Sequence, residues 1–120
     1  MGIVSNTISS RYAPDLMKRL GIHGLFDIIV LSAGFGHRKP HPSIFLEAVR
    51  NMPLAPARCA YVGDNPSRDV AGPRKVGFGM TVLIRNPERV LPEPLDGGEH
   101  PDEFIDELSD LLKLFVGVKA

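Results

Sequence analysis

An apolar segment that ends in an acidic turn constrains this chain more than any other part of the sequence. Residues 60–62 (Ala-Tyr-Val) are typical of a short buried strand, which stops at Gly63 directly before Asp64. Residues 65–67 (Asn-Pro-Ser) indicate a turn, and a helix is expected to begin near Asp69. In open parallel sheets, ligands bind just outside the carboxyl ends of the strands. The segment therefore predicts an α/β fold with a carboxylate at the ligand-binding edge.

Strand-like and helix-like segments alternate over the first two thirds of the chain. We expect strands at 2–4, 26–31, 59–62 and 80–84, and helices that begin at Pro14, at Pro42 and near Asp69. Pro73 falls inside the last of these helices and is expected to kink or shorten it. This alternation predicts a three-layer, Rossmann-like architecture in which helices cover both faces of a parallel sheet.

The composition is that of an ordinary globular domain. The 120 residues carry 14 Lys and Arg against 14 Asp and Glu, so neither nucleic acid nor an anionic membrane is an expected partner. The longest apolar stretch, residues 25–35, is too short to cross a membrane and contains Asp27. Cys59 is the only cysteine, which favours a reducing compartment. No leader peptide is visible after Met1, so we expect a cytoplasmic protein.

The C-terminal part of the sequence has a different pattern. Four prolines and a Gly-Gly pair predict a linker over 87–101, so that the core domain covers 1–86. Beyond the linker, apolar residues recur at helical spacing: Phe104, Leu108, Leu111, Leu112 and Phe115. We therefore expect an amphipathic helix over 102–120 that packs on the core.

Polar residues follow three of the expected strands. Ser5 and Asn6 come after the first strand, and Lys39 lies in the loop after the second. Asp64 and Asp69 follow the third. Because the tips of parallel strands share one edge of the sheet, these residues can converge. A hydroxyl and backbone N–H groups can hold phosphate, a lysine adds positive charge, and carboxylates hold Mg²⁺.

Each of these residues also has a simpler interpretation. Ser5 could only end a strand, Lys39 could be a solvated loop lysine, and Asp69 could be a first-turn carboxylate stabilised by the helix dipole. His37 and His41 are four residues apart, but the intervening Lys-Pro pair prevents a helical ligand face, so zinc is not expected.

Three segments in order resemble motifs of the haloacid dehalogenase-like hydrolases, and the resemblance covers residues 2 to about 86. The segments are 2–6 (Gly-Ile-Val-Ser-Asn), 38–45 (Arg-Lys-Pro-His-Pro-Ser-Ile-Phe) and 62–69 (Val-Gly-Asp-Asn-Pro-Ser-Arg-Asp). The resemblance implies Mg²⁺-dependent hydrolysis of small phosphorylated metabolites, through an aspartyl-phosphate intermediate.

The same resemblance implies a role for each polar residue at the strand tips. Ser5 and Asn6 would bind the substrate phosphate, and Asp64 would ligate Mg²⁺. Lys39 would neutralise the charge of the phosphate and the nucleophile. Asp69 would act on the reaction indirectly, by holding the metal-bound waters or Lys39. Lys39 and Asp69 are therefore the expected catalytic residues of this chain.

One part of the family pattern is missing. Its first motif, an Asp-x-Asp at the tip of the central strand, has no match, because no acidic residue precedes Asp15. Asp15 belongs to an expected helix, and Asp27 lies at the start of its strand, at the end opposite the expected site. We therefore expect an incomplete sheet without the central nucleophile strand. Loss of the nucleophile would lower the rate on the order of 10⁴-fold or more, so we expect a fragment that is inactive alone.

Three interpretations of this incomplete pattern stay open. The first is a phosphohydrolase fragment whose exposed sheet edges favour a homodimer or strand exchange. The second is a non-catalytic regulatory or scaffolding module with the same fold. The third is reconstitution of the site with a separate polypeptide that supplies the first motif. The sequence does not identify the substrate.

Overall fold

The computed structural model describes residues 1–50, 52–85, 87–88 and 100–115. Within them, five strands form two parallel sheets. The first sheet pairs β1 (Gly2–Ser5) with β2 (Ile28–Leu31). The second has the order β3 (Ala60–Gly63), β4 (Met80–Ile84), β5 (Glu103–Ile105). The parallel pairing confirms the predicted α/β class.

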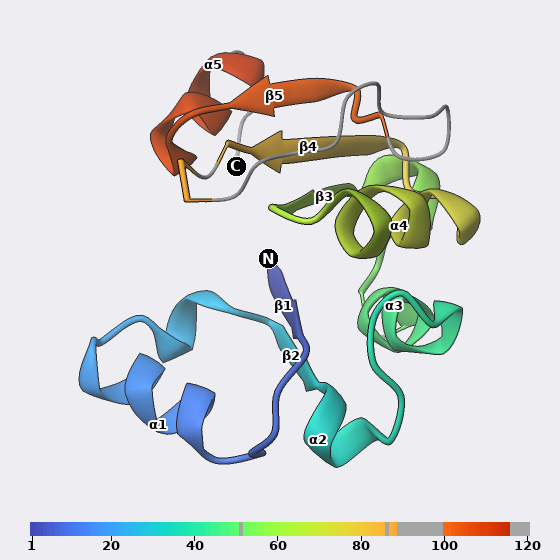
Figure 1. Ribbon diagram of the computed structural model, residues 1–120. Coiled ribbons are helices and arrows are strands. Elements are labelled where there is room, and N and C mark those ends of the chain that lie inside the picture. The colour runs from blue at the N-terminus through green and yellow to red at the C-terminus, as the bar shows by residue number, and fades with distance from the viewer. Residues whose placement is uncertain (51, 86, 89–99, 116–120) are drawn as a thin grey trace.

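Short helices alternate with the strands, as Figure 1 shows. The α-helices are α1 (Tyr12–Arg19), α2 (Ser32–Phe35), α3 (Pro42–Arg50), α4 (Gly72–Lys75) and α5 (Leu111–Leu114). A π-helical turn covers Ser67–Ala71, and 3₁₀ turns cover His23–Leu25, Pro56–Arg58 and Leu108–Asp110. The helix that follows β3 therefore changes from π to α geometry directly before Pro73. None of the helices described is long and apolar enough to cross a membrane.

The sheet is interrupted between β1 and β3, the nearest strands of the two sheets in Figure 1. Among the described residues, these strands share no backbone pairing. The Tyr61 hydroxyl of β3 donates a hydrogen bond to the Val4 carbonyl of β1 over 3.3 Å. The described strands thus form two separate sheets, which is consistent with the expectation of an incomplete sheet.

The core lies where α3 packs against β1, β2 and α4. Ile44 and Phe45 of α3 are fully buried. Phe45, Tyr61 and Phe78 form an edge-to-face cluster with ring centroids 5.3–6.4 Å apart. Gly72 is needed at the contact of α4 with α3, because an added Cβ would lie 2.6 Å from the Phe45 ring. α3 therefore connects the two sheets through one aromatic core.

The register of the first sheet fixes the ends of its strands. Ser5 pairs with Leu31 at the carboxyl end. At the amino end, the Met1 ammonium donates to the Asp27 carboxylate over 2.6 Å, and this cation lowers the pKa of that carboxyl group. Asp27 is therefore at the edge opposite Ser5, as the sequence predicts.

The predicted helix over 102–120 is wrong at its start. Residues 103–105 form β5, which pairs in parallel with β4, and helical geometry returns only at 108–114. The backbone of β4 binds this segment directly, since Asp102 N–H donates to the Thr81 carbonyl and Arg85 N–H to the Ile105 carbonyl. Ile105, outside the expected helical stripe, is 3% exposed, whereas Leu112, inside it, is 76% exposed. Residues 89–99 of the predicted linker, and 116–120, lie outside the described residues.

Candidate functional site

The loop after β1 is joined to the loop that carries Lys39. The Asn6 Oδ1 atom accepts the Lys39 backbone N–H over 2.7 Å, and its Nδ2 donates to the Lys39 carbonyl over 3.2 Å. The Ser32 hydroxyl accepts the Thr7 N–H over 2.8 Å and donates to the Thr7 carbonyl over 3.1 Å. Asn6 and Ser32 therefore hold the end of β1 against the two segments that follow β2.

Lys39 and Asp69 form a buried ion pair. The Lys39 Nζ atom donates to Asp69 Oδ1 over 2.7 Å, and the two side chains are 13% and 3% exposed. The same ammonium lies 5.5 Å from the centroid of the Tyr61 ring. Burial of two charges costs several kcal/mol each before pairing, so the geometry of such a pair is strongly specified. The position of the ammonium is therefore fixed by Asp69 and the aromatic core.

The second oxygen of Asp69 organises the turn after β3. Asp69 Oδ2 accepts the backbone N–H groups of Asp64 over 3.0 Å and Asn65 over 2.9 Å. A Cβ added at Gly63 would overlap the Asp69 carboxyl group, so glycine is required where that carboxylate crosses the chain. The position of Asp69 therefore explains why glycine stands at the end of β3, directly before Asp64.

Asn65 completes this turn, and sequence reasoning gave it no role. Its Oδ1 atom accepts the Arg68 N–H over 3.0 Å and the Ser67 hydroxyl over 2.9 Å, and its carbonyl accepts the Asp69 N–H over 2.7 Å. An Asn at the start of a helix commonly caps the backbone N–H group three residues later, and this preference could have identified the interaction with Arg68. Asn65 therefore sets the direction in which the chain leaves Asp64.

The three strand tips are connected by a continuous chain of contacts. Asn6 binds the Lys39 backbone, the Lys39 ammonium binds Asp69, and Asp69 binds the Asp64 N–H. The predicted convergence of these four residues is therefore observed. Ser5 is half-buried next to Asn6, and its hydroxyl has no hydrogen bond to any residue that the structure describes. The chemical roles of the five residues stay predictions.

The donor set fits Mg²⁺ only in part. Both Asp69 oxygens accept hydrogen bonds, which suits support of the site better than direct ligation. Asp64 stands at the tip of β3 and can supply one carboxylate. The described residues contain no group of three or more His, Cys, Asp or Glu side chains that could hold a metal. One carboxylate suffices only where phosphate oxygens, waters or a second carboxylate complete the shell.

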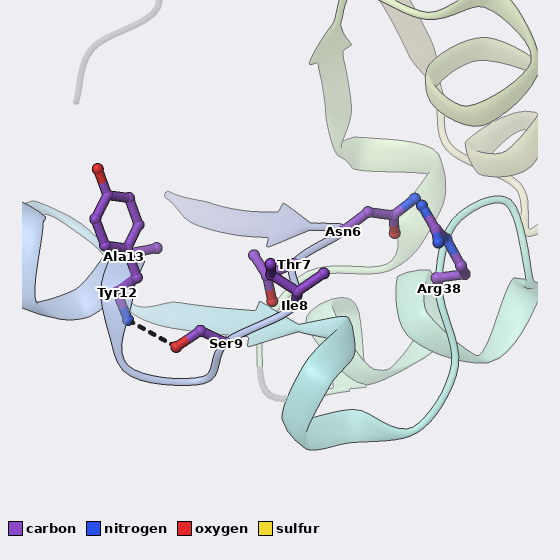
Figure 2. A pocket seen from close by; sticks show the side chains of 7 residues that line it. All are labelled: Asn6, Thr7, Ile8, Ser9, Tyr12, Ala13 and Arg38. Atoms are coloured by element: carbon purple, nitrogen blue, oxygen red, sulfur yellow. Dashed lines mark hydrogen bonds between the residues drawn. The ribbon is translucent and has the colours of Figure 1, made fainter.

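A cavity of about 640 Å³ adjoins this cluster beside the loop that follows β1. Its lining residues are Asn6, Thr7, Ile8, Ser9, Tyr12, Ala13 and Arg38. Figure 2 shows Asn6 and Arg38 at one end of the cavity and Tyr12 with Ala13 at the other. Sequence reasoning did not find this cavity, because Ile8 and Tyr12 carry no motif. The cavity and the strand-tip cluster share Asn6.

Comparison with known proteins relates this chain to one family of hydrolases. The sequence model described as haloacid dehalogenase-like hydrolase matches residues 1–83. The glyceraldehyde 3-phosphate phosphatase of Methanopyrus kandleri is 36% identical over 112 residues, which cover 93% of this chain and 47% of that protein. The phosphoserine phosphatase of Thermus thermophilus is 37% identical over 102 residues, which cover 82% of this chain and 39% of that protein.

A solved structure agrees with these relatives. The crystal structure of a phosphatase of this type from Thermococcus onnurineus matches with a TM-score of 0.79 at 28% identity. The match covers 99% of this chain and 51% of that one. The chain therefore spans about half the length of the relatives that it matches.

Proposed function

This chain belongs to the haloacid dehalogenase-like hydrolase family, and we propose that it forms the phosphate-binding half of a phosphohydrolase site. The complete site would hydrolyse small phosphomonoesters through an aspartyl-phosphate intermediate. Two relatives that are 36% and 37% identical are named phosphatases, which supports this reaction class. The lone Cys59 is in keeping with a cytoplasmic protein.

The observation that carries the proposal is the buried contact between Lys39 and Asp69. An ammonium has three donors, and one of them is directed at Asp69, so the other N–H bonds can reach a phosphate oxygen. Asp69 also fixes the Asp64 backbone, so a single carboxylate sets both the cationic and the acidic part of the site. Such fixed dipoles and charges stabilise a transferring phosphoryl group without reorganisation.

Ser5 and Asp64 complete the proposed binding set. The Ser5 hydroxyl would donate to a phosphate oxygen from the end of β1, while Asn6 holds the Lys39 loop in place. Asp64 would hold Mg²⁺, which supplies charge neutralisation at the phosphoryl oxygens when bound.

The described residues do not place a third carboxylate at the strand-tip cluster. Asp15 lies in the first turn of α1, and Asp27 is held by Met1 at the opposite edge. We therefore propose that this chain binds phosphate without turnover, and that the nucleophile comes from a further segment of polypeptide. The interrupted sheet edges at β1 and β3 would accept such a strand, or the corresponding edge of a second copy.

Calorimetric titration with inorganic phosphate in the presence of Mg²⁺ tests the binding function. We expect measurable binding that is lost in Lys39→Gln and kept in Lys75→Gln, an exposed lysine of α4. Circular dichroism reports whether each variant folds, and Ser5→Ala provides a second test that spares the ion pair. Absence of phosphate binding in the unmodified chain contradicts the proposal.

A separate assay tests the expected lack of turnover. We expect no Mg²⁺-dependent release of phosphate from an aryl phosphate by the purified chain. Clear turnover that disappears in Lys39→Gln would show that the described residues hold a complete catalytic set. A chain that binds phosphate without turnover, and that gains no activity when a polypeptide with the first motif is added, would favour a regulatory module.

A further inference from the structure

The cavity beside the loop after β1 combines apolar walls with one cation. Ile8, Tyr12 and Ala13 are its apolar lining residues, and Ile8 and Tyr12 are 105% and 72% exposed. Arg38 closes the end nearest Asn6 (Figure 2). The volume of about 640 Å³ is within the range of roughly 300–1,000 Å³ found for small-molecule sites.

The Arg38 guanidinium is available to a ligand. The side chain is exposed, and it makes no hydrogen bond or ion pair with any of the residues that the structure describes. A guanidinium presents a rigid fork of donors that matches the two oxygens of a carboxylate or a phosphate. The cavity therefore offers one strong recognition element for an oxyanion beside an apolar surface.

The cavity is coupled to the phosphate-binding cluster by covalent and hydrogen-bonded links. Arg38 directly precedes Lys39, whose backbone is held at both N–H and carbonyl by Asn6. Asn6 lines the cavity as well. Asn6 is therefore shared by the cavity and the cluster, and a ligand that spans both passes beside Asn6.

We propose that this cavity is a subsite for an acidic substituent of the substrate, and that Arg38 recognises that oxyanion. The inference rests on the proposed phosphate-binding function and narrows its substrate class. The substrate is a small phosphomonoester whose alcohol portion carries a carboxylate or a second phosphate. Its short carbon chain contacts Ile8 and Tyr12.

The subsite is tested by comparing the dissociation constants of matched phosphate esters for the unmodified chain, with Mg²⁺ present. Ethyl phosphate has a neutral alcohol portion, phosphoglycolate adds a carboxylate, and the bisphosphate of ethylene glycol adds a second phosphate. We expect phosphoglycolate or the bisphosphate to bind roughly 10- to 100-fold more tightly than ethyl phosphate, as a charge-assisted hydrogen bond provides. Whichever probe is preferred identifies the oxyanion.

Two variants of equal charge assign the preference to Arg38. Arg38→Gln is expected to reduce the ratio of affinities between the acidic probe and ethyl phosphate to about one. Arg58→Gln, at an exposed arginine just before the amino end of β3, is expected to keep the ratio. Equal affinities for ethyl phosphate and both acidic probes overturn the subsite and leave the proposed function intact. Failure of every phosphate probe overturns the proposed function, and the subsite with it.

Discussion

Asp69 binds Lys39 with one carboxylate oxygen and the turn that carries Asp64 with the other. The contacts measure 2.7 Å to the Lys39 ammonium and 3.0 Å to the Asp64 N–H. A residue expected to act indirectly thus connects two of the three strand tips. Substitutions at Asp69 are therefore expected to affect stability and phosphate binding together.

Replacement of Asp69 by asparagine removes the carboxylate charge that pairs with the largely buried Lys39 ammonium. Loss of one partner of a buried ion pair costs about 3–5 kcal/mol of unfolding free energy. Asp69→Asn is expected to lose stability in this range, measured by urea unfolding. The control is Asp106→Asn, which disrupts an exposed pair with Arg85 and is expected to cost less than about 1 kcal/mol. Equal losses in the two variants would contradict the structural role of Asp69.

Gly63→Ala is expected to push the Asp69 carboxylate out of place. The added Cβ overlaps that carboxyl group, and overpacking of this kind costs about 1–3 kcal/mol. Phosphate affinity is expected to fall in parallel, because Lys39 and the Asp64 turn both depend on Asp69. Gly24→Ala serves as a control, since no heavy atom lies within 4 Å of its added Cβ. A stable Gly63→Ala variant with normal phosphate affinity would count against this packing.

Ser5→Ala separates a phosphate-binding serine from one that only ends a strand. The Ser5 hydroxyl has no hydrogen bond to the residues described, so unfolding free energy is expected to change by less than about 0.5 kcal/mol. Phosphate affinity is expected to fall roughly 10- to 100-fold, for one lost hydrogen bond to a charged group. Ser10→Ala, at an exposed position in the loop that follows β1, is expected to change neither quantity. Reduced stability with unchanged affinity would support the simpler interpretation.

Tyr61 makes stability fall in alkaline solution. Burial, with a smaller contribution from the Asp69 charge, raises the pKa of its hydroxyl group. Tyr61 therefore ionises first in the unfolded chain, and its contribution to stability is constant below the ordinary tyrosine pKa of about 10 and is lost as the pH rises above it. The chain has two tyrosines, so Tyr12→Phe leaves Tyr61 as the only one.

In Tyr12→Phe, tyrosinate absorbance is expected to increase only as circular dichroism reports unfolding. Ionisation near pH 10 in a chain that stays folded would contradict the burial of Tyr61. The companion variant Tyr61→Phe is expected to lose stability less steeply above pH 10 than the unmodified chain.

Local sequence patterns predicted most of the strands and the placement of the site residues at the strand ends. The expected strand at 80–84 has the bounds of β4, because it is an apolar run, interrupted only by Thr81, between turn residues. Convergence of Asn6, Lys39 and Asp69 followed from the rule that parallel strands end at one edge. These features depend on nearest neighbours in sequence or on topology alone.

Features that depend on long-range contacts were not predictable. Phe104 also fits a helical stripe, but segment 103–105 forms a strand because it pairs with the edge of β4. The clamp of Asn6 on the Lys39 backbone joins residues 33 apart. The cavity at Arg38 arises only when the loop after β1 and the loop after β2 are placed together.

Residue-resolved NMR during titration with inorganic phosphate and Mg²⁺ tests most directly whether three strand tips form one site. We predict that amide shifts of residues 5–7, 39 and 63–65 change together, with one dissociation constant, and that Lys39→Gln abolishes all of them. Changes confined to one of these segments, or distributed over unrelated surfaces with different dissociation constants, would contradict a common site.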